Sequence, residues 1–266
     1  MTIEKSDAIV IRTVDFSESS LVLELFSRDF GKIRGIAKGA RRLKNSFDSA
    51  LDLLTRISLS FIRKNSDALD LLTEAKLITR FHTRRSGLPG LYAGCYLAEL
   101  LQMTTEEGEA LPELYDLAVE TLAGFEEGVR IEENLWRFQW CLLENLGERP
   151  SMETCIVCGT PISFEDEIRF GRNVGFALLD GGTVCADCRQ REVFKQLVSV
   201  DPRAAARISR YSTGEPLPSP EPMSSRVVSD IRGLTDWVIN TKCGRKPKLQ
   251  ETVRNALKEV YQQKSE

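Results

Sequence analysis

Residues 19–37 read SSLVLELFSRDFGKIRGIA, and this stretch decides the fold predicted for the first part of the chain. Its apolar and small residues recur at every second position: Leu21, Leu23 and Leu25, then Ile33, Gly35 and Ala37. A period of two places these residues on one face of a β-strand. Residues 28–31 (RDFG) between the two sets suit a tight turn, because Gly31 can adopt a positive φ. The stretch therefore predicts a hairpin with one buried face.

Outward from this hairpin, three further segments of the first eighty residues have the composition of strands. They are residues 7–14 (DAIVIRTV), 57–61 (ISLSF) and 68–72 (ALDLL). Five short strands within about seventy residues fit a small closed barrel. We therefore expect residues 1–80 to form a β-barrel domain.

From about residue 84 the spacing of the apolar residues changes to that of helices. Apolar stripes run through residues 91–102, 114–125, 135–146, 227–238 and 249–260. We expect an all-α domain in two parts, residues 81–150 and 197–266, with a different element at 151–196. The proline-rich stretch 212–223 (STGEPLPSPEPM) predicts a loop or linker within the second part.

Four of the seven cysteines form two CxxC pairs in the element at 151–196: Cys155 with Cys158, and Cys185 with Cys188. A two-residue gap lets both sulfurs of a pair face one ion, and four thiolates complete the tetrahedral shell of structural zinc. We predict a structural Zn²⁺ site, with residues 167–170 and 175–179 pairing as a hairpin between the cysteine pairs. Redox-active dithiols or unliganded thiols are the alternative.

Positive charge is concentrated in residues 28–44 (RDFGKIRGIAKGARRLK), where seven lysines and arginines stand against one aspartate, a local charge of +6. The whole chain has a net charge of −3, so the remainder carries −9. Residues 104–133 hold ten acids and one arginine. This segregation favours an anion-binding face. We predict phosphate contacts from Lys32, Arg34, Lys38, Arg41, Arg42 and Lys44. A merely solvated charged hairpin is the alternative.

Four phenylalanines near this segment could stack on bases, although core packing is the favoured interpretation for each: Phe16, Phe26, Phe30 and Phe47. No catalytic pattern accompanies them. The pair Gly31-Lys32 lacks the upstream glycine of a phosphate-binding loop, and no serine elbow or acidic metal cluster is present. A single histidine also argues against histidine-based catalysis. The sequence contains no run of eighteen apolar residues, so no membrane span is predicted.

The order of several short motifs resembles the start of the RecO family. Residues 8–12 (AIVIR) lead to 15–21 (DFSESSL), then to 30–32 (FGK) and 37–42 (AKGARR). RecO proteins combine an N-terminal OB-fold barrel, a helical domain and, in many members, a four-cysteine zinc element, and all three are expected here in that order. The resemblance therefore implies an α+β chain whose OB-fold barrel precedes an all-α domain carrying the zinc element.

The resemblance also implies a function in recombinational DNA repair without enzymatic activity. Family members bind single- and double-stranded DNA, anneal complementary strands and, with RecR, help load RecA onto DNA coated by single-strand-binding protein (SSB). It implies that the SSB C-terminal tail docks on the helical domain, and that the protein is cytoplasmic and nucleoid-associated. A nucleic-acid-modifying enzyme with an OB-fold and a zinc ribbon, or a protein-interaction adaptor, are the alternatives.

Overall fold

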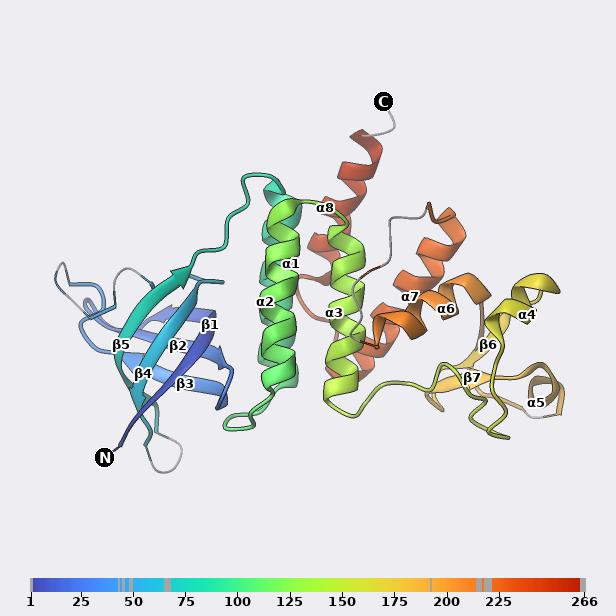
Figure 1. Ribbon diagram of the computed structural model, residues 1–266, viewed down its shortest axis with the longest axis horizontal. Coiled ribbons are helices and arrows are strands. Elements are labelled where there is room, and N and C mark those ends of the chain that lie inside the picture. Colours follow the sequence, from blue (N-terminus) through green and yellow to red (C-terminus); the bar gives the residue numbers. More distant parts are fainter. Residues whose placement is uncertain are drawn as a thin grey trace. The chain divides into compact units, whose positions relative to one another are not determined.

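The computed structural model describes residues 2–42, 44, 46–47, 50–64, 68–191, 193–213, 217 and 222–263, with side chains up to residue 258. The chain divides into two compact units. The first contains residues 1–135 and 243–266, and the second contains residues 136–242. The ribbon in Figure 1 labels most of their helices and strands.

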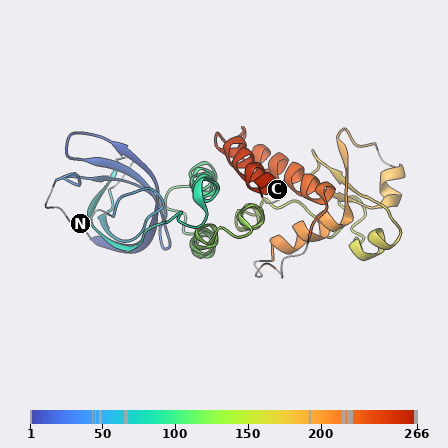
Figure 2. The same ribbon diagram turned by 90° about the horizontal axis from the view of Figure 1, so that it is seen from above.

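The first unit begins with a closed five-stranded barrel (Figures 1 and 2). Its strands are β1 (Ile3–Asp15), β2 (Leu21–Ser27), β3 (Gly31–Ala37), β4 (Arg56–Ile62) and β5 (Asp70–Thr79). They are hydrogen-bonded in the order β1-β2-β3-β5-β4, and β1 also pairs with β4 to close the ring. Only the short β3–β5 pairing is parallel. This arrangement confirms the predicted OB-fold barrel.

The predicted period of two places the apolar residues inside the barrel. Leu23, Leu25 and Ile33 are buried in one cluster with the following residues from other strands: Val10, Ile57, Leu59, Phe61 and Leu72. The turn at residues 28–31 is present, and Gly31 has a φ of 63°. Burial of one face thus fixes the register, since a slip by one residue would turn this cluster outward.

The first unit also contains the start of α3 (Ile131–Asn145) and three complete helices. These are α1 (Gly87–Thr104), α2 (Pro112–Glu127) and α8 (Gln250–Gln263). Phe26 of β2 and Tyr115 of α2 have ring centroids 6.3 Å apart, so α2 covers part of the barrel wall. The side chain of Gln102 on α1 donates a 2.6 Å hydrogen bond to the Ile11 carbonyl of β1. Helix α8 packs against α1 although some 150 residues separate them in sequence.

The second unit combines most of α3 with a small sheet and four helices. Its remaining elements are α4 (Phe164–Arg169), β6 (Val174–Ala177), β7 (Gly182–Val184), α5 (Ala186–Arg191), β8 (Leu197–Val200), α6 (Pro202–Tyr211) and α7 (Ser225–Lys242). The sheet has the order β7-β6-β8. Trp140 of α3 is fully buried and donates a 2.9 Å hydrogen bond to Thr235 of α7.

The predicted hairpin of residues 167–170 with 175–179 is wrong. Residues 164–169 form helix α4, and β6 pairs with β7 and β8 instead. Ser163 caps α4 by accepting a hydrogen bond from the Asp166 amide, and three acids occupy its first turn, which stabilises a helix there. Most of the proline-rich stretch, residues 214–216 and 218–221, lies outside the described residues.

Candidate nucleic-acid interface and metal site

The outer face of β1, β2 and β3 presents two rows of side chains that run across the strands. In the first row, Arg12 lies opposite Glu24, and Glu24 lies opposite Arg34. The second row is apolar and consists of Val14, Val22 and Ile36. The register shifts between Val10 and Arg12, and this bulge allows Arg12 to be exposed although Val10, two positions earlier, is buried in the barrel core. The face therefore combines an apolar row with a row of two arginines and one carboxylate, in which Arg12 is 3.2 Å from Glu24.

Phe16 lies where β1 runs into the loop before β2, and its side chain is 64% exposed. A shallow hollow of about 220 Å³ is lined by this ring, by two arginines, by two carboxylates and by apolar side chains: Arg12, Arg34, Asp15, Glu24, Val14, Val22 and Leu23. The interpretation of Phe16 as core is wrong. Phe26 and Phe47 are buried, and Phe30 packs against the barrel core, as expected. An exposed aromatic ring beside arginines is a surface on which a nucleic-acid base can stack.

The six predicted phosphate-binding residues lie on and just beyond β3, in different electrostatic settings. Arg34 is 3.5 Å from Glu107, and Arg41 is 3.1 Å from Asp15, and both arginines are about half exposed. Lys38 and Lys44 are exposed, with no ion-pair partner in the part of the chain that the structure describes. Arg42 is exposed in the turn after Gly39. Exposed ion pairs contribute little, so polyanions can compete for these arginines.

Lys32 has a different position, because its ammonium group points at the end of α1. It donates hydrogen bonds of 3.1 Å to the Gln102 carbonyl and 2.5 Å to the Thr105 carbonyl. A cation at a helix C-terminus satisfies carbonyls that have no partner within the helix. Lys32 therefore holds α1 against β3, and less of its charge faces outward.

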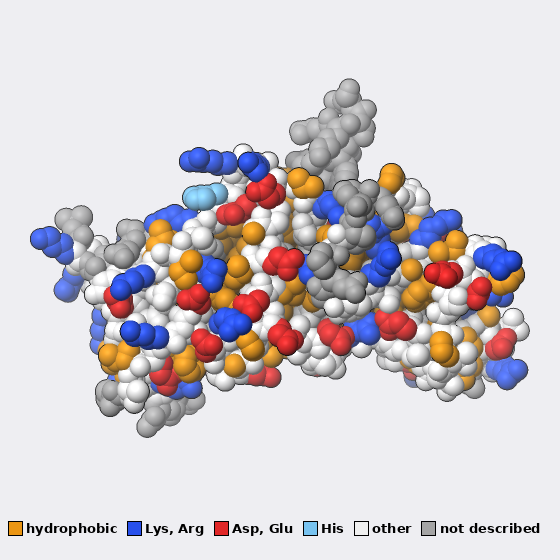
Figure 3. All heavy atoms as spheres, viewed as in Figure 1, with side chains coloured by type: hydrophobic (Ala, Val, Ile, Leu, Met, Phe, Trp, Pro, Cys, Tyr) orange, Lys and Arg blue, Asp and Glu red, His pale blue; other side chains and the backbone are white. Residues whose placement is uncertain are grey.

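The acidic segment that follows α1 lies along the basic hairpin. Glu107 forms a β-bridge with Gly31, and the Gly108 amide donates to the Lys32 carbonyl at 3.3 Å. A side chain at Gly31 would lie 1.9 Å from the Glu109 carbonyl oxygen. Acidic and basic side chains are thus interspersed on the first unit, as the face in Figure 3 also shows over the barrel. The charge segregation in the sequence does not become a purely positive face here.

The turn between β2 and β3 is held to α2 by Arg28. Its guanidinium donates two hydrogen bonds to Asp116, of 3.0 and 2.9 Å. This bidentate pair lowers the pKa of Asp116 and raises the pKa of Arg28. Arg28 is therefore a structural residue of the hairpin.

The four paired cysteines meet in the second unit. The potential ligand atoms of Cys155, Cys158, Cys185 and Cys188 all lie within 4.8 Å of one another. The first pair precedes α4, and the second pair lies at the junction of β7 and α5. The Gly159 amide donates to the Cys155 carbonyl, and the Cys188 amide points at the Cys185 sulfur at 3.4 Å. Such turns aim both sulfurs of a pair at one point, and the cluster could hold a metal ion.

Hydrogen bonds make the four thiols unequal. Hydrogen bonding with Thr160 lowers the pKa of Cys158 to about 6, whereas hydrogen bonding with Cys185 raises the pKa of Cys188 to about 12. Four adjacent thiolates repel one another, so all four ionise together only when a cation neutralises them. The donor set therefore fits a soft divalent metal.

Family profiles match nearly the whole chain. The domain described as recombination protein O N terminal matches residues 1–81, and the domain described as recombination protein O C terminal matches residues 85–251. A DNA repair protein RecO from Rhodopirellula baltica is 34% identical over 264 residues, which cover 91% of this chain and 96% of the relative. The chain belongs to the RecO family.

Other RecO relatives agree with this assignment. A DNA repair protein RecO from Syntrophomonas wolfei is 32% identical over 185 residues, 69% of either chain. One from Bacillus pumilus is 29% identical over 208 residues, covering 77% of this chain and 75% of the relative. Among the described residues of this RecO-family chain, no helix is long and apolar enough to cross a membrane.

The sequence alone missed two features of the outer face in this RecO-family chain. Arg12 was overlooked because it lies outside the basic cluster, and only the strand register places it beside Arg34. Phe16 was identified as aromatic, but its exposure depends on the end of β1 at Asp15. The sequence did contain a signal for Arg12. It stands two positions before Val14 on the same predicted strand, and residues two positions apart share a face.

Proposed function

We propose that this RecO-family chain is a recombinational DNA repair mediator that binds single- and double-stranded DNA and anneals complementary strands. The observation that carries the proposal is the outer face of β1, β2 and β3, where the 64% exposed Phe16 lies beside Arg12 and Arg34. OB-folds bind oligonucleotides on the face of β2 and β3 and on the adjoining loops. Stacking and phosphate contacts together give affinity with little dependence on sequence.

Phosphate contacts are assigned to Arg34, Lys38, Arg41, Arg42 and Lys44, with Lys32 contributing mainly through the packing of α1. These side chains follow β3 and the loop after it, so one strand could pass several of them. Annealing forms and breaks no covalent bond. A protein promotes it when it neutralises two phosphate backbones, since this lowers their mutual repulsion. We therefore propose a non-enzymatic mechanism.

With RecR, the protein helps load RecA onto SSB-coated single-stranded DNA, and the helical part receives the acidic C-terminal tail of SSB. These partners and a cytoplasmic, nucleoid-associated location are proposed from family membership and from the DNA-binding face. The names of the curated relatives, all DNA repair protein RecO, support this role.

We propose Zn²⁺ as the ion of the four-cysteine cluster. The sulfurs of Cys158 and Cys185 are 3.8 Å apart. A tetrahedral zinc with Zn–S bonds of about 2.3 Å has sulfur–sulfur edges of about 3.8 Å, which supports this choice. With four protein ligands, the ion would supply structural stability and leave no position for a catalytic water.

A salt series on DNA binding tests the phosphate contacts. The variant Lys38→Ala/Arg41→Ala/Arg42→Ala should bind a labelled oligonucleotide more weakly for every sequence. The slope of log K against log salt should become shallower by about 2, roughly 0.7 for each lost single-strand contact. Unchanged affinity and slope in fluorescence anisotropy would exclude these residues from the interface.

Strand annealing on SSB-coated DNA tests the function as a whole. Addition of the protein should accelerate annealing of complementary strands, and added RecR should promote RecA loading on the same DNA. The triple variant serves as the control, since it keeps the fold but has three fewer exposed cations. Failure of the unmodified protein to anneal strands would contradict the proposal. Joined or cut strands in the presence of magnesium would indicate an enzyme instead.

A further inference from the structure

Helix α6 of the second unit has two dissimilar sides. Ala204, Ala205, Ile208 and Tyr211 are buried, whereas three arginines, Arg203, Arg207 and Arg210, follow one another at helical spacing along the other side. Such a pattern repeats a positive charge roughly once per turn. Residues 189–210 contain six arginines and lysines against two acids, a local charge of +4 outside the basic hairpin.

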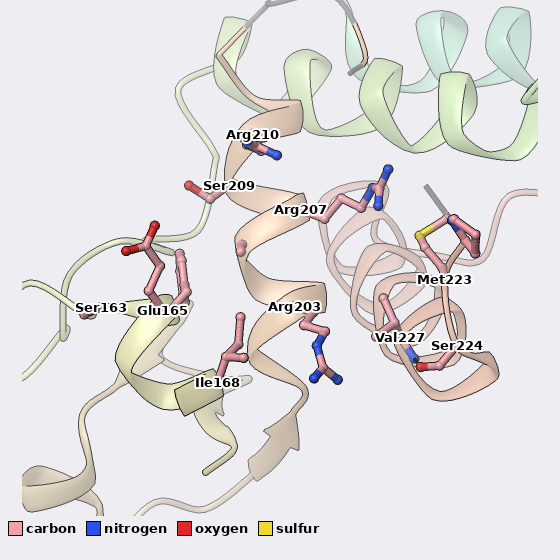
Figure 4. Close-up of a pocket in the computed structure, with 13 residues that line it drawn as sticks. Ser163, Glu165, Ile168, Arg203, Arg207, Ser209, Arg210, Met223, Ser224 and Val227 are labelled. Carbon is pink, nitrogen blue, oxygen red and sulfur yellow. Dashed lines mark hydrogen bonds between the residues drawn. The ribbon is translucent and has the colours of Figure 1, made fainter. Parts of the chain in front are cut away.

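The arginines line a groove of about 730 Å³ within the second unit. Figure 4 shows α6 between α4 and the beginning of α7, with Arg203 and Arg207 directed towards the α7 side. Apolar side chains, among them Ile168 and Val227, line the same groove. The lining contains these three arginines and one acid, Glu165, which lies on the α4 side of α6 in Figure 4.

Two of the three α6 arginines, Arg203 and Arg210, have exposed charges at the two ends of the row. Across the described residues, neither Arg203 nor Arg210 has an ion-pair partner, and both are exposed. Arg203 also lies in the first turn of α6, where the positive end of the helix dipole disfavours a cation. Helix stability therefore does not account for the position of Arg203, and its charge is available to an anion outside the unit.

An exposed aromatic ring follows the α4 wall of this groove. Phe170 is 61% exposed, and the guanidinium groups of Arg169 and Arg172 lie 5.9 and 4.9 Å from its ring centroid. A helix-terminating turn defines the backbone beside this ring, because Gly171 has a φ of 63° and the Arg172 amide donates to the Glu167 carbonyl. Arg172 is fixed further by two hydrogen bonds to the Glu167 carboxylate, of 3.0 and 3.1 Å.

We propose that the α6 groove and the Phe170 turn form a second binding surface for single-stranded nucleic acid. The arginines of α6 contact phosphates, and Phe170 stacks on a base. A row of cations along an open groove suits an extended polyanion better than a compact ligand, and an exposed ring suits the π-face of any base. The inference rests on the proposed DNA-binding function and extends it, since annealing requires contact with two strands.

The test uses the full chain, in which the barrel contribution is reduced first. In the Lys38→Ala/Arg41→Ala/Arg42→Ala background, binding to a labelled oligo-dT of about 30 nucleotides should persist and remain sensitive to salt. Adding Phe170→Ala, Arg203→Ala and Arg210→Ala should weaken it by about tenfold. The slope against salt should become shallower by about 1.4, for two lost phosphate contacts.

The control variant Arg85→Ala/Arg226→Ala also removes two positive charges. Each of these arginines already has an acidic partner, Glu127 for Arg85 and Asp230 for Arg226. This variant should leave binding unchanged. Photo-crosslinking of the unmodified protein to 5-iododeoxyuridine-containing oligo-dT should label a peptide that contains Phe170. All three substituted residues are exposed, so thermal melting and zinc content should not change.

Three outcomes would overturn the inference. If groove substitutions leave affinity and slope unchanged and no crosslink maps to the second unit, the barrel is the DNA site and the proposed function survives. If the substitutions abolish binding of an oligo-glutamate peptide but not of oligo-dT, the groove recognises acidic protein segments. If the unmodified chain binds no DNA at all, the inference and the proposed function fail together.

Discussion

Phe16 is the single side chain of the barrel whose environment differs most from the sequence-based expectation. Aromatic residues are most often core, and periodicity cannot decide the matter at a strand end, where alternation stops. The structure leaves the ring 64% exposed beside Arg12 and Val14. Large exposed aromatic groups in a cation-lined hollow are characteristic of binding surfaces.

Replacing Phe16 with Ala should weaken binding to single-stranded DNA by about tenfold, since one base loses its stacking partner. The melting temperature should stay the same, because little apolar area is buried by this side chain. Phe16→Tyr keeps the aromatic face and should retain affinity. Fluorescence anisotropy measures the affinity of the unmodified protein and of both variants. If Phe16→Ala binds as tightly as the unmodified protein, the ring does not contact DNA.

Gly31 illustrates how one residue connects the hairpin to the acidic segment after α1. Gly31→Ala should destabilise the protein by about 1–2 kcal/mol for the positive φ alone. The new methyl group would also meet the Glu109 carbonyl at 1.9 Å, so that segment must move at a further cost of roughly 1–3 kcal/mol.

Gly108→Ala is the matched control for this prediction, because Gly108 also has a positive φ, 78°, and a methyl group there meets no atom within 4 Å. Urea denaturation should show a larger loss for the Gly31 variant than for the Gly108 variant. Equal losses would mean that the contact with Glu109 has no energetic importance.

At the scale of elements, the barrel strands and the long helices were predictable, and the small elements of the second unit were not. Strands such as β2 and β3 bury one face, so their period of two is visible in the sequence. Helix α4 has only six residues and none of them is buried, so it leaves no apolar stripe. Its acidic first turn after Ser163 was the available signal.

The candidate metal site was predictable for a different reason. Four cysteines in two CxxC pairs specify their geometry locally, whatever fold surrounds them. The outer face of the barrel depends instead on pairing between strands, as for Arg12 and Arg34 on either side of Glu24. Basic composition pointed to the segment, but only the register identified the residues that share a surface.

Removal of the proposed metal should destabilise the sheet of β6, β7 and β8 without destabilising the barrel. Cys185→Ser/Cys188→Ser, or a chelator, should eliminate bound zinc and remove on the order of 10 kcal/mol of local folding energy. Amides of β6, β7 and β8 should then exchange rapidly in hydrogen–deuterium exchange, whereas amides of the barrel should keep their protection. Unchanged protection of β6 in zinc-depleted protein would mean that the cluster does not stabilise this sheet.

At the scale of the whole molecule, the charge pattern combines a net charge of −3 with a strongly basic hairpin. The acidic segment after α1 moderates this hairpin, since Glu107 is 3.5 Å from Arg34. DNA must displace that carboxylate to reach the arginine, and each added negative charge nearby weakens attraction for phosphate.

Glu107→Ala should therefore raise affinity for single-stranded DNA by about two- to threefold at low salt, with a smaller gain at high salt. Glu113→Ala removes an equal charge from the first turn of α2, whereas Arg34 is paired with Glu107, and it is the control. Anisotropy at two salt concentrations distinguishes them. Identical affinities of both variants would indicate that only net charge matters.

The packing of α8 against α1 has a consequence for synthesis on the ribosome. Val253 and Leu257 are buried, yet they are made after the entire second unit. The unit that contains the cysteine cluster can finish folding while α1 still lacks this cover. A premature stop codon near residue 250 would thus yield a chain with an intact cysteine cluster and an exposed apolar α1, which is a substrate for chaperones and proteases.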